Sequence, residues 1–147
     1  VEETRIVVDD LVEYVKSVEG QVEKVTLNFA LQEDGTLLDR DKSTEILDRY
    51  PQIEYLSGGF HNWEFTKNGV NKGSGLKFLA ERIGVAMDET MACGDSQNDY
   101  SMLAAAKVAV AMGNATEQIK GIADFITLSN EESGVGYAID KFVFHKA

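Results

Sequence analysis

The segment Met-Ala-Cys-Gly-Asp-Ser-Gln-Asn-Asp, residues 91–99, constrains the fold of this chain more than any other stretch. A short apolar run, typical of a strand buried on both faces, ends at Gly94 and is followed at once by Asp95, Asn98 and Asp99. In parallel α/β sheets, ligands bind just beyond the carboxyl ends of the strands. The segment therefore predicts a buried parallel strand that presents a polar site at the edge of its sheet.

The rest of the second half fits a parallel sheet whose two faces are covered by helices. Residues 71–85 predict a helix that ends at Gly84, and its apolar face comprises Leu76, Leu79, Ala80 and Ile83. Short apolar runs then alternate with segments long enough to cross over a sheet, in the order TMACG, NDYSMLAAA, VAVAMG, ATEQIKG, DFIT and GVGYAIDKFVF. Asn114 with Glu117 predicts a capping pair for the helix within ATEQIKG.

The first half, residues 1–66, has a different pattern and predicts an α+β arrangement. A helix is expected over residues 8–18, capped by Asp10 and ended by Gly20. Alternation predicts a strand within residues 22–31, followed by a turn at Glu-Asp-Gly-Thr, residues 33–36. A helix over residues 41–50 and one or two strands around Gly58-Gly59 complete an antiparallel sheet with helices on one side. The boundary between the halves is expected near residues 66–70.

The charge of the chain limits its partners. Lys and Arg number 14 against 25 Asp and Glu, a formal net charge of −11. Such a surface repels phosphate backbones and anionic lipid, so we expect neither nucleic acid nor membrane as a partner. Asp95 and Asp99, packed together, would repel and raise the pKa of one carboxyl group, and Mg²⁺ would remove the conflict.

Compartment and chain ends are also suggested by the sequence. Cys93 is the one cysteine, so there is no disulfide framework. No stretch is long enough to span a membrane, and the first residues are acidic where a signal peptide would be basic. These features predict a cytoplasmic protein. Because the chain starts with Val rather than Met, we expect its natural beginning to be missing.

At this point the residues show a family resemblance. Residues 94–103, GDSQNDYSML, resemble the fourth motif of haloacid dehalogenase (HAD) superfamily phosphatases, in the Cof-type form with a type IIB cap. Residues 68–85 resemble the segment with the third motif, whose lysine would be Lys72, and residues 108–142 resemble the stretch that closes the core. The resemblance implies that residues 1–66 are part of an α+β cap. It implies that residues 67–147 are the C-terminal half of a HAD-like Rossmannoid core.

The resemblance also implies an activity and roles for residues. The activity is Mg²⁺-dependent hydrolysis of a small phosphorylated metabolite, such as a sugar phosphate, through an aspartyl-phosphate. Lys72, Asp95 and Asp99 would be catalytic, with Asp95 and Asp99 as metal ligands, and Lys72 and Asn98 would bind the phosphoryl group. The alternative for Lys72 is a solvated lysine at a helix start, which is the unfavourable end of the helix dipole for a cation.

The family's first motif, Asp-x-Asp-Gly-Thr, supplies the attacking aspartate and has no counterpart here. In residues 31–39, LQEDGTLLD, Gln32 stands where the nucleophile belongs, and an amide is too weak a nucleophile. Residues 39–41, Asp-Arg-Asp, are followed by Lys-Ser instead of Gly-Thr. We therefore expect residues 33–36 to form a hairpin turn of the cap. The chain alone is expected to be an inactive C-terminal piece, with a sheet edge through which it could dimerise.

The loop around residues 57–66, SGGFHNWEFT, is the predicted surface that reads the rest of the substrate. His61 and Asn62 are its candidate substrate-binding residues, whereas Trp63 is equally compatible with a core position. Three other functions stay open: a related phosphoryl-transfer enzyme, a noncatalytic HAD-fold binding or regulatory module, and an unrelated α/β domain.

Overall fold

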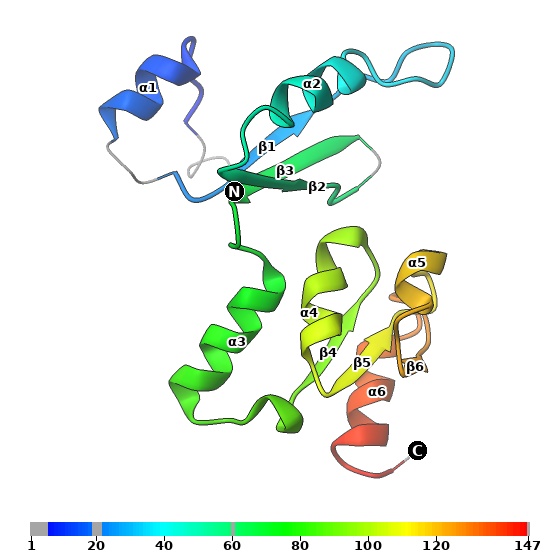
Figure 1. The fold of residues 1–147 in the computed structure, drawn as a ribbon. Coiled ribbons are helices and arrows are strands. Elements are labelled where there is room, and N and C mark those ends of the chain that lie inside the picture. The colour runs from blue at the N-terminus through cyan, green and yellow to red at the C-terminus, as the bar shows by residue number, and fades with distance from the viewer. Residues whose placement is uncertain (1–5, 19–21, 60, 147) are drawn as a thin grey trace.

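The computed structural model describes residues 6–18, 22–59 and 61–146, which form an upper α+β part and a lower α/β part (Figure 1). The upper part, up to Lys67, is called the cap, and the lower part, from Lys72 on, is called the core. The chain passes from cap to core once within the described residues, between Lys67 and Lys72. Strand pairing is antiparallel before this connection and parallel after it. The domain boundary expected near residues 66–70 stays a prediction.

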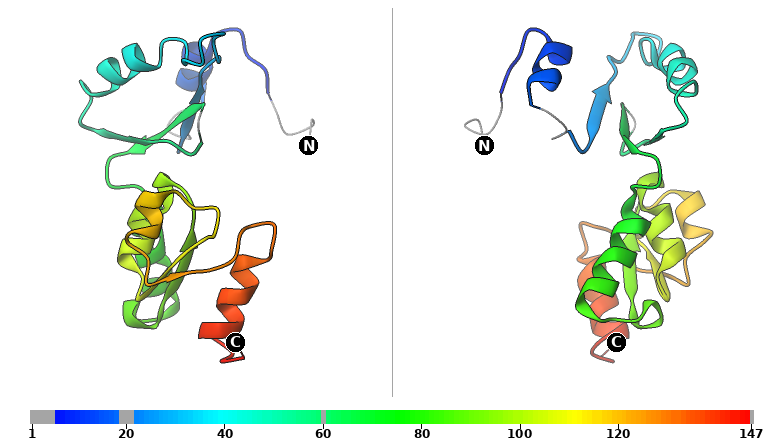
Figure 2. Two further views of the ribbon diagram at one scale, coloured as in Figure 1. Left: turned by 90° about the vertical axis from the view of Figure 1, so that its right-hand side faces the viewer. Right: turned by 60° about the vertical axis from the view of Figure 1, so that its left-hand side comes forward.

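The cap is built on a three-stranded antiparallel sheet with the order β1–β3–β2. Its strands are β1 (Val25–Asn28), β2 (Ile53–Leu56) and β3 (Asn62–Lys67). Helix α2 (Arg40–Leu47) packs on the face of the sheet that turns away from the core. Helix α1 (Leu11–Ser17) lies beyond one end of β1 (Figures 1 and 2).

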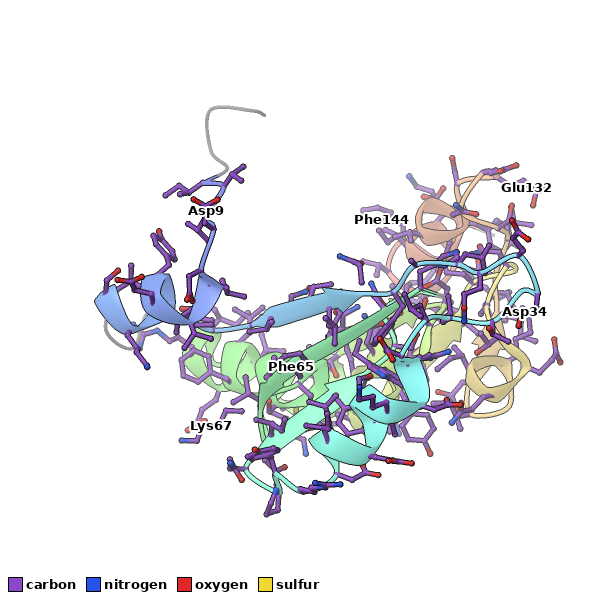
Figure 3. The ribbon with its side chains drawn as sticks, turned by 90° about the horizontal axis from the view of Figure 1, so that it is seen from above. Asp9, Asp34, Phe65, Lys67, Glu132 and Phe144 are labelled. Carbon is purple, nitrogen blue, oxygen red and sulfur yellow. The ribbon has the colours of Figure 1, made fainter. Side chains whose placement is uncertain are left out.

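The predicted ends of α1 and the predicted turn can be checked directly. The Asp10 carboxylate accepts a hydrogen bond from the Glu13 backbone N–H at 2.9 Å, which confirms the N-cap. Helix α1 ends at Ser17, and Gly20 lies outside the described residues. Gly35 has a φ of 82°, and the Asp34 carboxylate accepts the Thr36 backbone N–H at 2.9 Å, so residues 33–36 form the predicted turn. From above, Asp34 lies at the far end of the cap from Asp9 (Figure 3).

The two faces of the cap sheet carry different side chains, because successive residues of a strand point to opposite faces. Trp63 faces α2: its ring lies 4.3 Å from the Arg40 guanidinium and makes an edge contact with Tyr55 at 5.1 Å between centroids. Trp63 is therefore a packing residue of the cap. Glu64 and Thr66 point the other way, toward the core.

The core contains a three-stranded parallel sheet with the order β4–β5–β6, which confirms the predicted α/β class. The strands are β4 (Met91–Gly94), β5 (Val108–Ala111) and β6 (Phe125–Ile126). Helices α3 (Lys72–Ile83), α4 (Tyr100–Ala105) and α5 (Glu117–Lys120) lie on one side, and α6 (Gly134–Phe142) lies on the other (Figure 2). Two short 3₁₀ turns, η2 (Met87–Glu89) and η3 (Gln97–Asp99), flank β4.

Small side chains dominate the buried centre of the core and let the helices approach the sheet closely. The buried cluster consists of Ala92, Leu103, Ala109, Ala111, Met112, Ala115 and Ile119. Helices α3 and α4 meet at Gly73, where an added Cβ would lie 2.7 Å from the Ser101 carbonyl carbon. This approach carries the first turn of α3 to the end of β4.

The predicted apolar face of helix α3 is only partly buried, so this prediction is wrong in part. Ala80 is buried and Leu76 packs against the core cluster, but Leu79 and Ile83 are 55% and 62% exposed. Helix α3 packs against α4 on one side, and β4 is the outermost strand of the described sheet. Within the described residues, nothing covers the outer side of α3. No helix among the described residues is long and apolar enough to cross a membrane.

Candidate active site

The loop after β4 is closed by the carboxylate of Asp99. Its Oδ2 accepts backbone N–H bonds from Asp95 at 3.0 Å and from Ser96 at 3.2 Å. Gly94 makes this possible, because a Cβ there would lie 2.5 Å from the Asp99 Cβ. The two predicted carboxylates therefore belong to one compact turn, with the Asp99 side chain only 8% exposed.

Lys72 reaches this turn from the start of α3. Its Nζ forms an ion pair with Asp99 Oδ1 and donates to Asn98 Oδ1 at 3.3 Å. The Gly73 backbone N–H donates to Ser101 Oγ at 3.0 Å, which fixes the first turn of α3 against α4. The structure thus brings together three residues singled out in the sequence, and Lys72 has a specific charged partner although its side chain is 47% exposed.

The pKa of Asp99 shows how the site deals with its negative charge. Burial raises this pKa, but the hydrogen bonds from Lys72 and from the backbone N–H groups of Asp95 and Ser96, with the Lys72 charge, outweigh burial. The net pKa lies below its ordinary value. The expectation that crowding raises the pKa of one of the two acids is wrong for Asp99, because Lys72 supplies the opposing charge.

Asp95 is oriented by two neighbours. Its Oδ1 accepts the Ser96 hydroxyl at 2.7 Å, and its Oδ2 accepts Asn114 Nδ2 at 3.1 Å. Asn114 Oδ1 in turn accepts the Asn130 backbone N–H at 2.9 Å. The predicted capping role of Asn114 is wrong, because Thr116 is the N-cap of α5 and the Asn114 side chain turns to Asp95. Its place after β5, at the same carboxyl edge as Asp95, is the signal that sequence reasoning missed.

The donor set suits part of a magnesium shell. Among the described residues, no group of three or more His, Cys, Asp or Glu side chains is arranged to hold a metal ion. Both oxygens of Asp99 are engaged by N–H and ammonium donors, whereas the Asp95 carboxylate accepts two bonds and has further lone pairs. Mg²⁺ keeps several waters and needs only one or two carboxylates. Asp95 fits a direct ligand, and Asp99 fits an indirect one.

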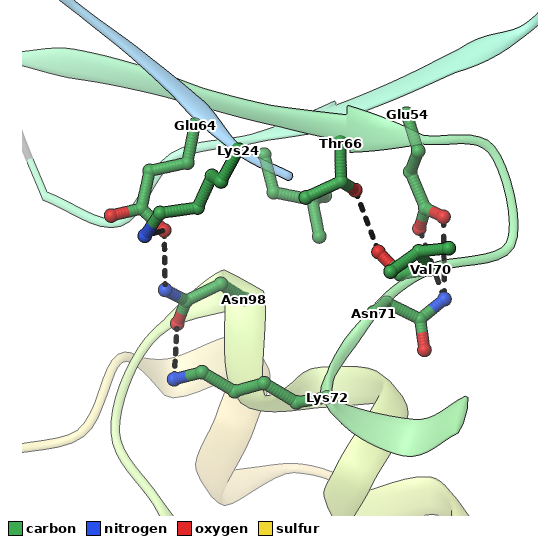
Figure 4. A pocket seen from close by; sticks show the side chains of 9 residues that line it. Lys24, Glu54, Glu64, Thr66, Val70, Asn71, Lys72 and Asn98 are labelled. Carbon is green, nitrogen blue, oxygen red and sulfur yellow. Dashed lines mark hydrogen bonds and ion pairs between the residues drawn. The ribbon is translucent and has the colours of Figure 1, made fainter. Parts of the chain in front are cut away.

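A pocket of about 280 Å³ lies between the cap sheet and this site (Figure 4). Its lining consists of Lys24, Glu54, Leu56, Glu64, Thr66, Val70, Asn71, Lys72 and Asn98. Asn98 Nδ2 donates to Glu64 Oε2 at 3.4 Å and so connects the core to the cap across the pocket. The Lys24 ammonium lies 3.3 Å from the same carboxylate.

His61 and Asn62 are absent from this lining. The His61 carbonyl accepts the Phe29 N–H at 2.8 Å, and Asn62 Oδ1 accepts the Gly58 N–H at 3.1 Å, which closes the turn between β2 and β3. Contact of either side chain with a substrate stays a prediction. The position of Glu64 in the pocket lining was not predicted from the sequence. Because successive residues of a strand point to opposite faces, placing Trp63 on the face of the cap sheet that carries α2 would have placed Glu64 on the face toward the core.

These observations define the class of protein. It has a parallel α/β core, with paired acids beyond a strand end and a lysine from the preceding helix, under an α+β cap. The chain belongs to the haloacid dehalogenase-like hydrolase family, whose model matches residues 24–139.

Several relatives of the chain are named as phosphatases. The chain is 49% identical over 92 residues to Phosphatase YwpJ of Bacillus subtilis, an alignment covering 60% of this chain and 32% of that protein. It is 36% identical to the 5-amino-6-(5-phospho-D-ribitylamino)uracil phosphatase YcsE of B. subtilis, covering 82% of this chain and 47% of YcsE. It is 42% identical to a phosphoglycolate phosphatase of Methanobrevibacter smithii, covering 69% and 42%. The chain thus spans less than half the length of these relatives.

Solved structures agree with this fold. The phosphatase BT1666 of Bacteroides thetaiotaomicron superposes with a TM-score of 0.77 at 28% identity, covering 92% of this chain and 46% of that one. The HAD subclass IIB sugar phosphatase BT4131 superposes with a TM-score of 0.72 at 28% identity, covering 88% and 46%. The matched portion includes both cap and core elements, since it exceeds four fifths of this chain.

Proposed function

We propose that this chain is part of a Mg²⁺-dependent phosphomonoester hydrolase that acts on a small phosphorylated metabolite. This part contains cap elements and the lysine, Lys72. The observation that carries the proposal is the convergence of Lys72, Asn98 and Asp99 at the end of β4, with Asp95 beside them. Lys72 and Asn98 line the pocket, and the Asp99 carboxylate, paired with Lys72, joins them to the loop that carries Asp95. Phosphoryl transfer needs positioning and charge stabilisation of this kind more than covalent chemistry.

Each residue has a role in this proposal. Asp95 would hold Mg²⁺, oriented by Asn114, and bound Mg²⁺ would supply positive charge to the phosphoryl oxygens. Asp99 would hold Lys72 in place and order the loop through its backbone N–H bonds. Lys72 has three N–H donors, and two of them are used by Asp99 and Asn98. The third is available for a phosphoryl oxygen.

The attacking aspartate is the part that these residues do not supply. In the family mechanism, an aspartate attacks phosphorus, the ester oxygen leaves, and water hydrolyses the aspartyl-phosphate. Gln32, which occupies the position of that aspartate in the closest motif, donates to Thr36 Oγ1 at 2.8 Å within the cap hairpin. We propose that the nucleophile comes from outside residues 1–147 and that the isolated chain does not turn over.

The test is p-nitrophenyl phosphate hydrolysis with and without Mg²⁺. We expect no turnover by the 147-residue chain and Mg²⁺-dependent turnover by the natural gene product that contains it, lost in Asp95→Ala. Asp88→Ala removes an exposed acid on η2 and serves as the matched control. Turnover by the isolated chain that depends on Asp95 would refute the missing nucleophile. A gene product without Mg²⁺-dependent turnover would refute the phosphatase proposal itself.

The substrate is a separate question. The relatives' names include a phosphate ester of a carboxylic acid, phosphoglycolate, and one of a polyhydroxylated amine, the ribitylaminouracil. Membership of the haloacid dehalogenase-like hydrolase family is compatible with either kind of phosphate ester. We propose a small phosphorylated metabolite such as a sugar phosphate, in keeping with the superposition on a sugar phosphatase.

A further inference from the structure

The cap side of the pocket carries an excess of negative charge. Lys24, Glu54 and Glu64 line it, giving a formal charge of 1 − 2 = −1. Lys72, at the floor, is already paired with Asp99. A group that extends from the phosphoryl site toward the cap therefore meets a net negative surface.

Glu64 is held in place on this surface, at the opposite end of the pocket from Glu54 (Figure 4). Its carboxylate accepts Asn98 Nδ2 at 3.4 Å and lies 3.3 Å from the Lys24 ammonium, with the side chain 25% exposed. The turn between β2 and β3 approaches the Glu64 carboxyl group closely, since a Cβ at Gly58 would lie 2.7 Å from the Glu64 Cδ. Asn62 closes that turn through the Gly58 N–H. The carboxylate is thus confined above Asn98.

Glu54, the other acid of the pocket, is occupied differently. Its two oxygens accept Asn71 Nδ2 at 3.2 and 3.3 Å, and one of them accepts the Gly69 N–H at 3.3 Å. These bonds tie Glu54 to the connection between cap and core. Glu64 is therefore the acid whose partner, Asn98, adjoins the proposed phosphoryl site.

We propose that Glu64 determines specificity by selecting leaving groups that donate hydrogen bonds, such as hydroxyl or amine groups, and by rejecting those with a second anionic group. This inference rests on the proposed function and narrows its substrate class. A hydroxyl or ammonium donor can replace Asn98 as the partner of the Glu64 carboxylate. A carboxylate or second phosphate at the same place would face a like charge, and Lys24 offsets that charge only in part because its side chain is 51% exposed.

The test compares two linear substrates that differ only at the end remote from the phosphate. Sorbitol 6-phosphate ends in a hydroxymethyl group and 6-phosphogluconate in a carboxylate. The measured quantity is the ratio of kcat/KM for 6-phosphogluconate to kcat/KM for sorbitol 6-phosphate, determined on the natural gene product that contains residues 1–147. A general loss of folding or phosphoryl binding lowers both values and leaves the ratio unchanged.

Three variants give different expected ratios. Glu64→Gln keeps the shape and an oxygen acceptor but removes the charge, so the ratio should rise by roughly tenfold. Lys24→Gln removes the offsetting cation, so the ratio should fall by about threefold. Glu45→Gln removes an exposed acid from α2, on the other face of the cap sheet, and should leave the ratio within about twofold.

Either of two results would overturn the inference. A Glu64→Gln ratio within about twofold of the unmodified protein, with p-nitrophenyl phosphate still hydrolysed, would show that Glu64 does not read the leaving group. A gene product that hydrolyses no phosphate ester at all would refute the proposed function and this inference with it. A raised ratio in Glu64→Gln and a lowered ratio in Lys24→Gln would establish that the charge of Glu64 selects against leaving groups with a second anionic group.

Discussion

The same substitution, Gly→Ala, should have opposite effects at two positions of α3 that are two residues apart. Gly73 faces α4, and Gly75 faces open space with no atom within 4 Å of an added Cβ. At Gly75, alanine gains only helix propensity, so the free energy of unfolding should rise by about 0.5–1 kcal/mol.

At Gly73 the same gain is outweighed by a clash. The new Cβ would lie 2.7 Å from the Ser101 carbonyl carbon, whereas carbon atoms in contact prefer about 3.5–4 Å. The obstacle is backbone, so α3 has to move away by about 1 Å, and overpacking of this kind costs about 1–3 kcal/mol. Net of propensity, Gly73→Ala should lower the free energy of unfolding by up to about 2.5 kcal/mol. Because the propensity gain is common to both variants, they should differ by the cost of the clash, about 1–3 kcal/mol.

Urea unfolding followed by far-UV circular dichroism measures this difference through the midpoint, provided that the slope is unchanged. The contact between α3 and α4 at this residue would be refuted if Gly73→Ala were as stable as Gly75→Ala. Because the shift of α3 also carries Lys72 away from Asp99, Gly73→Ala should weaken phosphate binding while Gly75→Ala leaves it unchanged.

Three further predictions concern the site. Lys72→Met should destabilise the chain by about 1–2 kcal/mol at pH 7, less than the loss of a fully buried pair, because Lys72 is half exposed. Since the pKa of Asp99 is lowered in the folded chain, its stabilising contribution is present above the ordinary value of 3.8 and is lost as the pH falls through the folded value. The difference in urea midpoint between the variant and the unmodified chain should therefore disappear below the folded pKa of Asp99, and a difference that stays constant with pH would contradict the ion pair. Burial raises the pKa of the Cys93 thiol, so iodoacetamide should alkylate it at pH 8 more slowly than in the urea-unfolded chain, and equal rates would contradict its half-buried position. Asn114→Ala should weaken Mg²⁺ binding about tenfold by calorimetry, and an unchanged affinity would show that Asn114 does not orient Asp95.

Local patterns were sufficient to predict the strand–loop–helix unit around Asp95. An apolar run followed by glycine and acids fixes where a parallel strand ends, and the carboxyl edge of such a sheet is where side chains from successive loops meet. The position of Asp95 depends on the order of elements along the chain, which periodicity reveals. Lys72 was placed instead by the resemblance of residues 68–85 to the third motif of the haloacid dehalogenase superfamily.

The features that the sequence did not predict correctly have a different origin. Asn114 and Glu64 act on residues 19 and 34 positions away, and no local pattern encodes which distant partner a polar side chain will meet. Leu79 and Ile83 follow helical spacing but are exposed, because periodicity reports an apolar face and not whether a neighbouring element covers it. The raised pKa expected for crowded acids failed at Asp99 because Lys72 arrives from another element.

The first turn of α3 is also a mechanical link. Asn71 accepts the Ser74 N–H at 3.0 Å, which starts the helix, and the same side chain donates to Glu54 of the cap at 3.2 Å. Lys72 is the next residue. A swing of the cap that stretches the Glu54–Asn71 bonds pulls on the residue that begins the helix. If the cap moves in this way, the start of α3 moves with it, and the proposed contact of Lys72 with a phosphate would weaken as the cap opens.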